Sequence, residues 1–159
     1  MRLWTVQHRA VLTELAGGLT GRWERVVPTW LPAYAEMVAE MARRGVDCAG
    51  NAPIWAWPGP DHRGERVQLT AELLVCPRTP EEYEQYVILD LRVPEPLVVL
   101  SSYGRWNDFL EAQFAGRPDA MDWTIDPGER KRSYTAGVQA CLPRLDPAWV
   151  LGSRVWTAA

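Results

Sequence analysis

The residues whose types and spacing could do chemistry are a glutamine and two tryptophans. Gln139 is a polar residue within the otherwise apolar segment 137–142, and Trp55 and Trp57 alternate between two prolines in the segment 53–58. Side chains alternate across a β-strand, so an extended segment places both indoles on one face. Flat aromatic walls with a few amide groups are typical of pockets that bind flat small molecules.

Two more polar side chains, Thr5 and Gln7, lie in the first apolar segment of the chain. Gln7, like Gln139, is more often solvent-facing when taken alone. Taken together with the indoles, they could line one cleft with amide and hydroxyl groups. The candidate ligand-binding residues are therefore Thr5, Gln7, Trp55, Trp57 and Gln139. The competing interpretation is that the two indoles form a wall of the hydrophobic core.

Other kinds of site lack the residues that they need. The three cysteines are far apart and the two histidines stand alone, so we expect no metal site. Neither a nucleophile elbow of the GxSxG type nor a glycine-rich phosphate loop occurs. Asp90 lies within a predicted strand, where a salt bridge to an arginine such as Arg92 is a more ordinary role than catalysis.

The composition predicts one globular domain rich in tryptophan. A chain of 159 residues can bury a core without disulfides or metal, so we expect residues 1–159 to form a single domain. Nine tryptophans stand against only two phenylalanines, so indoles must supply much of the aromatic packing. Each buried indole N–H needs a partner, which favours the edge of a core or a cleft.

Charge and hydropathy set expectations about location and partners. A net charge of −3 makes nucleic acid an unfavoured partner. No apolar run reaches the length of a membrane span, and the first residues lack the apolar core of a secretion signal. We therefore expect a reduced, cytoplasmic protein without a membrane partner. The sequence carries no signal for an oligomeric state.

A sheet is needed to hold the candidate residues, and the hydrophobic pattern predicts one. Strands are predicted at residues 3–7, 53–58, 67–73, 86–93, 97–100, 136–142 and 149–156. Helices are predicted near residues 11–16, 31–44 and 101–114, with a helical turn after Thr79. We therefore predict an α+β domain with a mainly antiparallel sheet and two or three packed helices.

The helix over residues 31–44 has the clearest signals. Thr29 is its predicted cap and Gly45 its predicted stop. Helical spacing predicts a core stripe made of Tyr34, Met37, Val38 and Met41. Glu36 and Glu40 are predicted to face elsewhere. Further along, the polar residues 116–134 are predicted to form a mobile loop. In a protein-interaction module, either this loop or an exposed edge strand would meet the partner.

Short motifs follow one another in a recognisable order along nearly the whole chain. They lie at residues 3–7, 33–34, 53–57, 89–94, 99–101, 106–110, 138–140 and 149–150. The LWT-x-Q opening and the W-x-W centre are the most specific of them. In this order the chain resembles the bacterial domain-of-unknown-function family 3841. That resemblance implies a single complete domain and no established activity.

The order of three segments also resembles the ADP-ribosyltransferase-like fold. Trp4 and Thr5 would lie on its first motif strand, and Trp55 and Trp57 on its second. Gln139 would then lie near the position of the catalytic glutamate, and the resemblance implies NAD as cofactor. The first strand lacks the usual His-x-Thr or Arg. A glutamine also cannot act as a carboxylate base.

Two functions are therefore predicted. The first is a cytoplasmic domain whose aromatic cleft binds a nucleotide-like or other flat small molecule. If this cleft catalyses a reaction, ADP-ribosyl or glycosyl transfer is the one that the resemblance implies, with Gln139 as the candidate catalytic residue. The second is a non-enzymatic protein-interaction module in which the tryptophans are structural.

Overall fold

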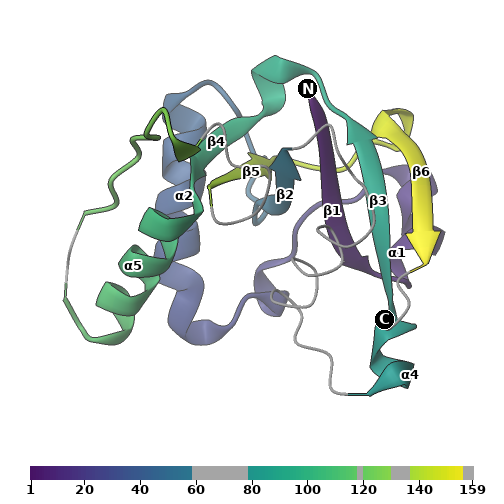
Figure 1. The fold of residues 1–159 in the computed structure, drawn as a ribbon, viewed down its shortest axis with the longest axis horizontal. Coiled ribbons are helices and arrows are strands. Elements are labelled where there is room, and N and C mark those ends of the chain that lie inside the picture. Colours follow the sequence, from purple (N-terminus) through teal and green to yellow (C-terminus); the bar gives the residue numbers. More distant parts are fainter. Residues whose placement is uncertain (59–78, 118–119, 130–136, 156–159) are drawn as a thin grey trace.

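A computed structural model describes residues 1–58, 79–117, 120–129 and 137–155. Its strands are β1 (Arg2–His8), β2 (Ile54–Pro58), β3 (Tyr86–Arg92), β4 (Val99–Ser102), β5 (Val138–Leu142) and β6 (Val150–Val155). They form one six-stranded sheet in the order β4-β5-β2-β1-β3-β6, with every pairing antiparallel (Figure 1). This arrangement confirms the predicted α+β class.

Four α-helices accompany the sheet within the described ranges. They are α1 (Val11–Glu14), α2 (Leu31–Arg43), α4 (Pro80–Tyr83) and α5 (Tyr103–Phe114). Short 3-10 helices occupy Leu15–Gly17, Trp23–Arg25, Pro28–Trp30, Glu95–Leu97 and Pro147–Trp149. The two longer helices, α2 and α5, pack beside each other next to β4 and β5 (Figure 1).

The predicted elements that lie within the described residues are present, with one shift. The strand expected at residues 97–100 begins at Val99, because Pro94 and Pro96 favour a helical turn before it. The strand expected at residues 67–73 lies outside the described residues.

The alternation along β2 separates two layers of the core. Ile54 and Ala56 pack in the cluster beneath the sheet that includes Leu15, Leu19, Leu145 and Trp149. Trp55 and Trp57 project from the opposite face, the one that α2 and α5 partly cover. The predicted sharing of one face by the two indoles is therefore confirmed.

Helix α2 matches its predicted span but differs in two details. Residue Trp30 precedes it without a side-chain cap, so the prediction of Thr29 as cap is wrong. Glu40, expected on an outer face, is only 8% exposed. Burial opposes its ionisation, but hydrogen bonds from Arg43 and Arg44, at 2.7 and 2.6 Å, hold the pKa of Glu40 below its ordinary value.

Two other expectations concern charged residues. Asp90 accepts two hydrogen bonds from the guanidinium of Arg154 on the neighbouring strand β6, so the suggested pairing with Arg92 is wrong. The Asp90–Arg154 pair could not be predicted because the two residues are far apart in the sequence. They meet because β3 and β6 are neighbouring strands in the sheet. Of the loop predicted at 116–134, residues 120–129 are tied to the start of α5, because Ser102 donates to Glu129 at 2.5 Å.

Candidate functional site

A cavity of about 510 Å³ lies where β1 and β2 separate. Its volume is within the range of small-molecule sites, roughly 300 to 1,000 Å³. Polar and aromatic side chains from five parts of the chain line it, namely Gln7, Thr20, Arg22, Arg25, Trp30, Tyr34, Trp55, Trp57, Tyr103, Trp106, Asn107 and Gln139. The structure thus brings four of the five predicted residues to one cavity, and the fifth, Thr5, lies just behind its wall.

The cavity exists because the ladder between β1 and β2 is short. β1 pairs with β3 along its whole length but with β2 only through Leu3 and Trp4. Beyond that point the Thr5 hydroxyl donates a 2.6 Å hydrogen bond to the carbonyl of Trp55. The Gln7 amide in turn donates to the Thr5 hydroxyl at 2.9 Å. Side chains therefore satisfy part of the backbone that a continued ladder would have paired.

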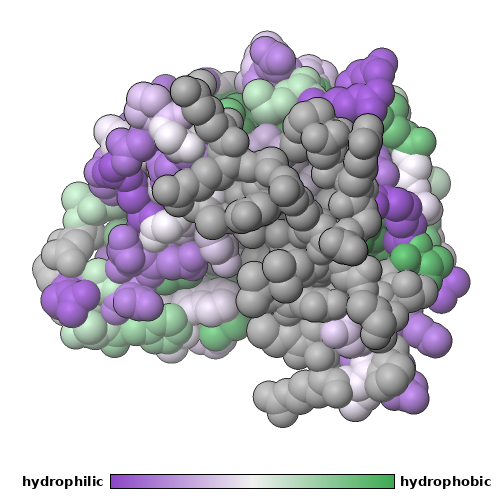
Figure 2. Space-filling view, viewed as in Figure 1, coloured by the Kyte–Doolittle hydropathy of each residue, from purple (hydrophilic) through white to green (hydrophobic). Residues whose placement is uncertain are grey.

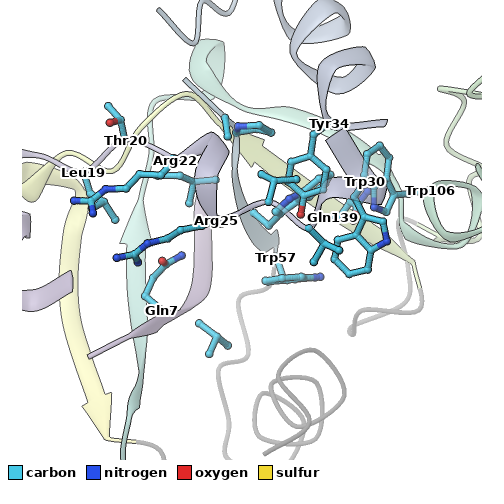
Figure 3. Close-up of a pocket in the computed structure, with 18 of the residues that line it drawn as sticks. Gln7, Leu19, Thr20, Arg22, Arg25, Trp30, Tyr34, Trp57, Trp106 and Gln139 are labelled. Atoms are coloured by element: carbon cyan, nitrogen blue, oxygen red, sulfur yellow. The ribbon is translucent and has the colours of Figure 1, made fainter. Parts of the chain in front are cut away.

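The labelled side chains of Figure 3 separate into two groups, with Trp57 between them. We name the first group, Trp30, Tyr34, Trp106 and Gln139, the aromatic end of the cavity. We name the second group, Gln7, Arg22 and Arg25, the arginine end. A ligand that fills the cavity would therefore meet flat apolar rings at one end and cationic groups at the other.

Ring-to-ring contacts hold the aromatic end in shape. The indole of Trp55 lies 4.8 Å from that of Trp106 and 5.6 Å from the Tyr34 ring, measured between centroids. The Tyr34 ring meets Trp55 edge-on, at an interplanar angle of 75°. Such contacts fix rings that come from α2, β2 and α5, so the wall is formed before any ligand arrives.

The two tryptophans of β2 take both of the roles, core wall and cavity wall, that the sequence left open. Trp57 is 6% exposed and packs on Trp4 with centroids 5.2 Å apart, so it belongs to the core. It also lines the cavity, as does the half-buried Trp55. The same pair is thus a core wall on one side and a cavity wall on the other.

Three indole N–H groups at the cavity are buried without a hydrogen-bond partner among the described residues. They belong to Trp30, Trp55 and Trp57, all of which line the cavity. A buried donor left unpaired costs about 1 to 3 kcal/mol, so native structures contain few of them. All the buried indole donors without a partner that the described residues contain therefore belong to residues lining one cavity.

Gln139 is held more firmly than a solvent-facing glutamine would be. It is 1% exposed, which excludes the solvent-facing interpretation. Its amide nitrogen donates to the Ser101 hydroxyl at 3.1 Å, across the β4–β5 ladder. Its carbonyl oxygen accepts no hydrogen bond within the described part of the chain. Gln139 can therefore accept a hydrogen bond from a ligand.

Tyr34 adds a hydroxyl to the aromatic end. Burial raises the pKa of Tyr34 to about 12, an effect that the neighbouring Trp55 side chain partly offsets. The Trp55 indole nitrogen nevertheless makes no hydrogen bond among the described residues. The phenol therefore stays protonated at neutral pH and acts as a hydrogen-bond donor or acceptor, not as a base.

The arginine end is carried by residues 19–27, which we name the arginine segment. Leu19 bridges to Leu145, and Gly21 bridges to Ala52. A Cβ atom at Gly21 would overlap the Ala52 carbonyl oxygen, so glycine alone fits this approach. The Trp23 indole donates to the Gly50 carbonyl at 2.8 Å. The segment is thus anchored at three points.

The sequence did not predict most of the residues that line the cavity. Tyr34 was predicted to belong to the core stripe of α2, and Trp106 was considered only as part of the motif at residues 106–110, yet both line the cavity. Trp30 was not singled out. Arg22 and Arg25 lay in a loop without regular periodicity. Their spacing of three residues was the available signal, but only the bridges at Leu19 and Gly21 place them over the cavity.

The described residues contain neither a cluster that could hold a metal ion nor a helix that could span a membrane, and comparisons with known proteins find no match for the chain. Among the described residues no group of three or more His, Cys, Asp or Glu side chains could hold a metal ion. None of the described helices has the length and apolar character that a membrane span requires. No family model, no curated protein and no solved structure matches the chain. The resemblances to family 3841 and to the ADP-ribosyltransferase-like fold therefore stay predictions.

Proposed function

We propose that the protein binds a flat, nucleotide-like small molecule in the cavity between β1 and β2. The observation that carries this proposal is the set of three unpaired indole N–H groups on one cavity. Stacking walls and convergent polar groups are the usual construction of a site for such a ligand. The ring system would lie at the aromatic end, with its acceptor atoms toward the indole nitrogens.

Binding, and not carboxylate-assisted catalysis, is the function that the lining supports. The described lining residues include two arginines and no carboxylate. Glycosyl transfer normally uses a carboxylate to stabilise the cationic centre. In our proposal Gln139 positions the ligand through its free carbonyl oxygen. If the bound ligand also reacts in this cavity, the reaction that we propose is ADP-ribosyl or glycosyl transfer. NAD would then be the cofactor that supplies the ADP-ribosyl group.

The proposal is tested by thermal shift and by intrinsic tryptophan fluorescence with NAD, ADP-ribose, AMP and adenosine. A ligand at about 100 times its Kd stabilises a protein by about 2.7 kcal/mol, which raises the Tm of a domain of this size by about 5 to 10 °C. Because several indoles line the cavity, the same ligand should change the fluorescence. No response to any of the four compounds would overturn the proposal.

A pair of tryptophan variants locates the binding. Trp30→Phe keeps an aromatic ring and removes one unpaired N–H, so we expect it to weaken binding about 5- to 10-fold. Trp123→Phe is the matched control, because Trp123 is half-buried and does not line the cavity. Equal weakening by both variants would show that the ligand does not contact Trp30.

An exposed apolar patch supports a second candidate function, the protein-interaction module. Val27, Leu31 and Phe114 are 46%, 38% and 57% exposed, and the Phe114 ring lies 6.4 Å from that of Trp30. Figure 2 shows apolar surface on the side of the molecule where α2 begins and α5 ends. Size-exclusion chromatography of the wild type and of Phe114→Ser tests whether this patch drives association.

We also propose that the protein works in the cytoplasm. Cys48 and Cys141 are free thiols in the core, as is usual in reducing compartments. Burial raises the pKa of both thiols, so they stay protonated and serve packing. Fractionation of the producing cells tests the location.

A further inference from the structure

We infer that the arginine end of the cavity binds one negative charge, so that the ligand class is a flat monoanion such as a cyclic phosphodiester of a nucleoside. This inference rests on the proposed function and deepens it, because it names the charge of the ligand. It starts from an asymmetry between Arg22 and Arg25. Both line the cavity, but only Arg22 has a partner.

The partner of Arg22 is a carboxylate outside the cavity. Glu14, at the end of α1, lies 2.5 Å from the guanidinium of Arg22. Both side chains are about two-fifths exposed, so the pair is screened by solvent, yet the charge of Arg22 is locally matched. Arg22 therefore contributes hydrogen-bond donors to the cavity without an unmatched charge.

Arg25 is different. It is exposed and has neither an ion pair nor a side-chain hydrogen bond among the described residues. In Figure 3 its guanidinium lies at the same end of the cavity as the Gln7 carboxamide. Because the described lining residues include no carboxylate, nothing in the described wall compensates this charge. One cation at the arginine end is thus left for a ligand.

The arginine segment presents this cation without needing to rearrange. Its anchors at Gly21 and Trp23 hold the backbone on both sides of Arg22 and close to Arg25. A binding group that is already in place loses less freedom when the ligand arrives. A guanidinium and an amide at the same end of the cavity suit a singly charged oxyanion, whereas a dianion would leave one charge unmatched.

A matched series of ligands tests the inference. Adenosine, 3′,5′-cyclic AMP and AMP share the base and ribose but carry no charge, one charge and close to two charges at pH 8. We expect cyclic AMP to bind most tightly, at least about 5-fold more tightly than adenosine, in isothermal titration calorimetry at low salt. Naphthalene-2-carboxylate against naphthalene-2-carboxamide repeats the comparison without a nucleoside.

Two variants of Arg25 test whether this residue causes the preference for charged ligands. Arg25→Met is expected to remove the advantage of the charged compounds while it changes adenosine binding less than about twofold. Arg25→Lys keeps the charge and is expected to keep the preference within about threefold. Arg92→Met, at an exposed arginine that does not line the cavity, is the control and should change neither.

A variant of Glu14 tests the role of the existing ion pair. Glu14→Gln releases the charge of Arg22, so the preferred ligand should shift toward AMP, with the AMP to cyclic AMP affinity ratio rising about 5-fold. Charge-independent binding of the whole series, or the same preference in Arg25→Met, would overturn this inference and leave the proposed function standing. Absence of all binding would overturn both.

Discussion

Two neighbouring parts of the β1–β2 junction use the same residue type for opposite purposes. In the closed part, where Trp4 pairs with Trp57, the indoles stack and complete a small core cluster with Ile88. In the open part, only two residues further along β1, the ladder has ended and the Trp55 indole faces a cavity. The role of a tryptophan here depends on whether the strand beside it is paired.

The closed part should be the more sensitive to truncation. Trp4→Ala removes a side chain that is 5% exposed and is expected to lower the free energy of unfolding by about 3 to 5 kcal/mol. Trp30→Ala, at the half-buried wall of the cavity, should cost less than half of that. Chemical denaturation monitored by circular dichroism measures both. Equal losses would show that the closed and open parts do not differ in packing.

The arginine segment should be sensitive to a single methyl group. Gly21→Ala places a Cβ against the Ala52 carbonyl, so the segment must shift, at a cost of about 2 kcal/mol, and ligand binding should fall. Gly17→Ala is the control, since a Cβ at Gly17 meets nothing within 4 Å. The expected contrast would be contradicted by a Gly21→Ala protein as stable as the control.

The stability of the open part should depend on the Thr5 hydroxyl, whereas that of the closed part depends on backbone pairing between β1 and β2. Thr5→Val keeps the shape of a fully buried side chain but removes its bonds to the Trp55 carbonyl and from Gln7. We expect a loss of about 1 to 2 kcal/mol in thermal or urea unfolding. Thr29→Val, at an exposed threonine, should stay within about 0.5 kcal/mol of the wild type.

Tyr34 gives the smallest effect, and it appears only at high pH. Its pKa is about 12 in the folded protein, above the ordinary value of 10.0. Its contribution is complete below the unfolded pKa and is lost as the pH rises through the folded pKa, because the unfolded phenol ionises first. Stability should fall by about 1 kcal/mol between pH 8 and pH 11, and Tyr34→Phe should lack this part of the fall.

Much of the fold could be predicted because local patterns encode it. The alternation at Trp55 and Trp57, the stripe through Met37 and Met41, and the proline and glycine boundaries each act over a few residues. The strand at Val99 was misplaced, since two prolines gave a mixed signal. The Asp90–Arg154 pair was missed because register between distant strands has no local signature.

The candidate site was predictable in its centre and not at its rim. Gln139, Trp55 and Trp57 stood out because polar or very large residues interrupt short apolar strands. Arg25 had no such signal, since an arginine in a polar loop is ordinary. It reaches the cavity only because the bridge at Gly21 brings its loop against the sheet.

The sequence by itself determined the strands, the helices and the face that each indole occupies, because these follow from periodicity and backbone preference over a few residues. The tertiary structure decided where the β1–β2 ladder stops, and therefore whether Trp55 and Trp57 face core or cavity. It also decided that Gln139 is buried against Ser101 and that one arginine is left without a partner. Such outcomes depend on contacts between residues far apart in the chain, which no local pattern can specify.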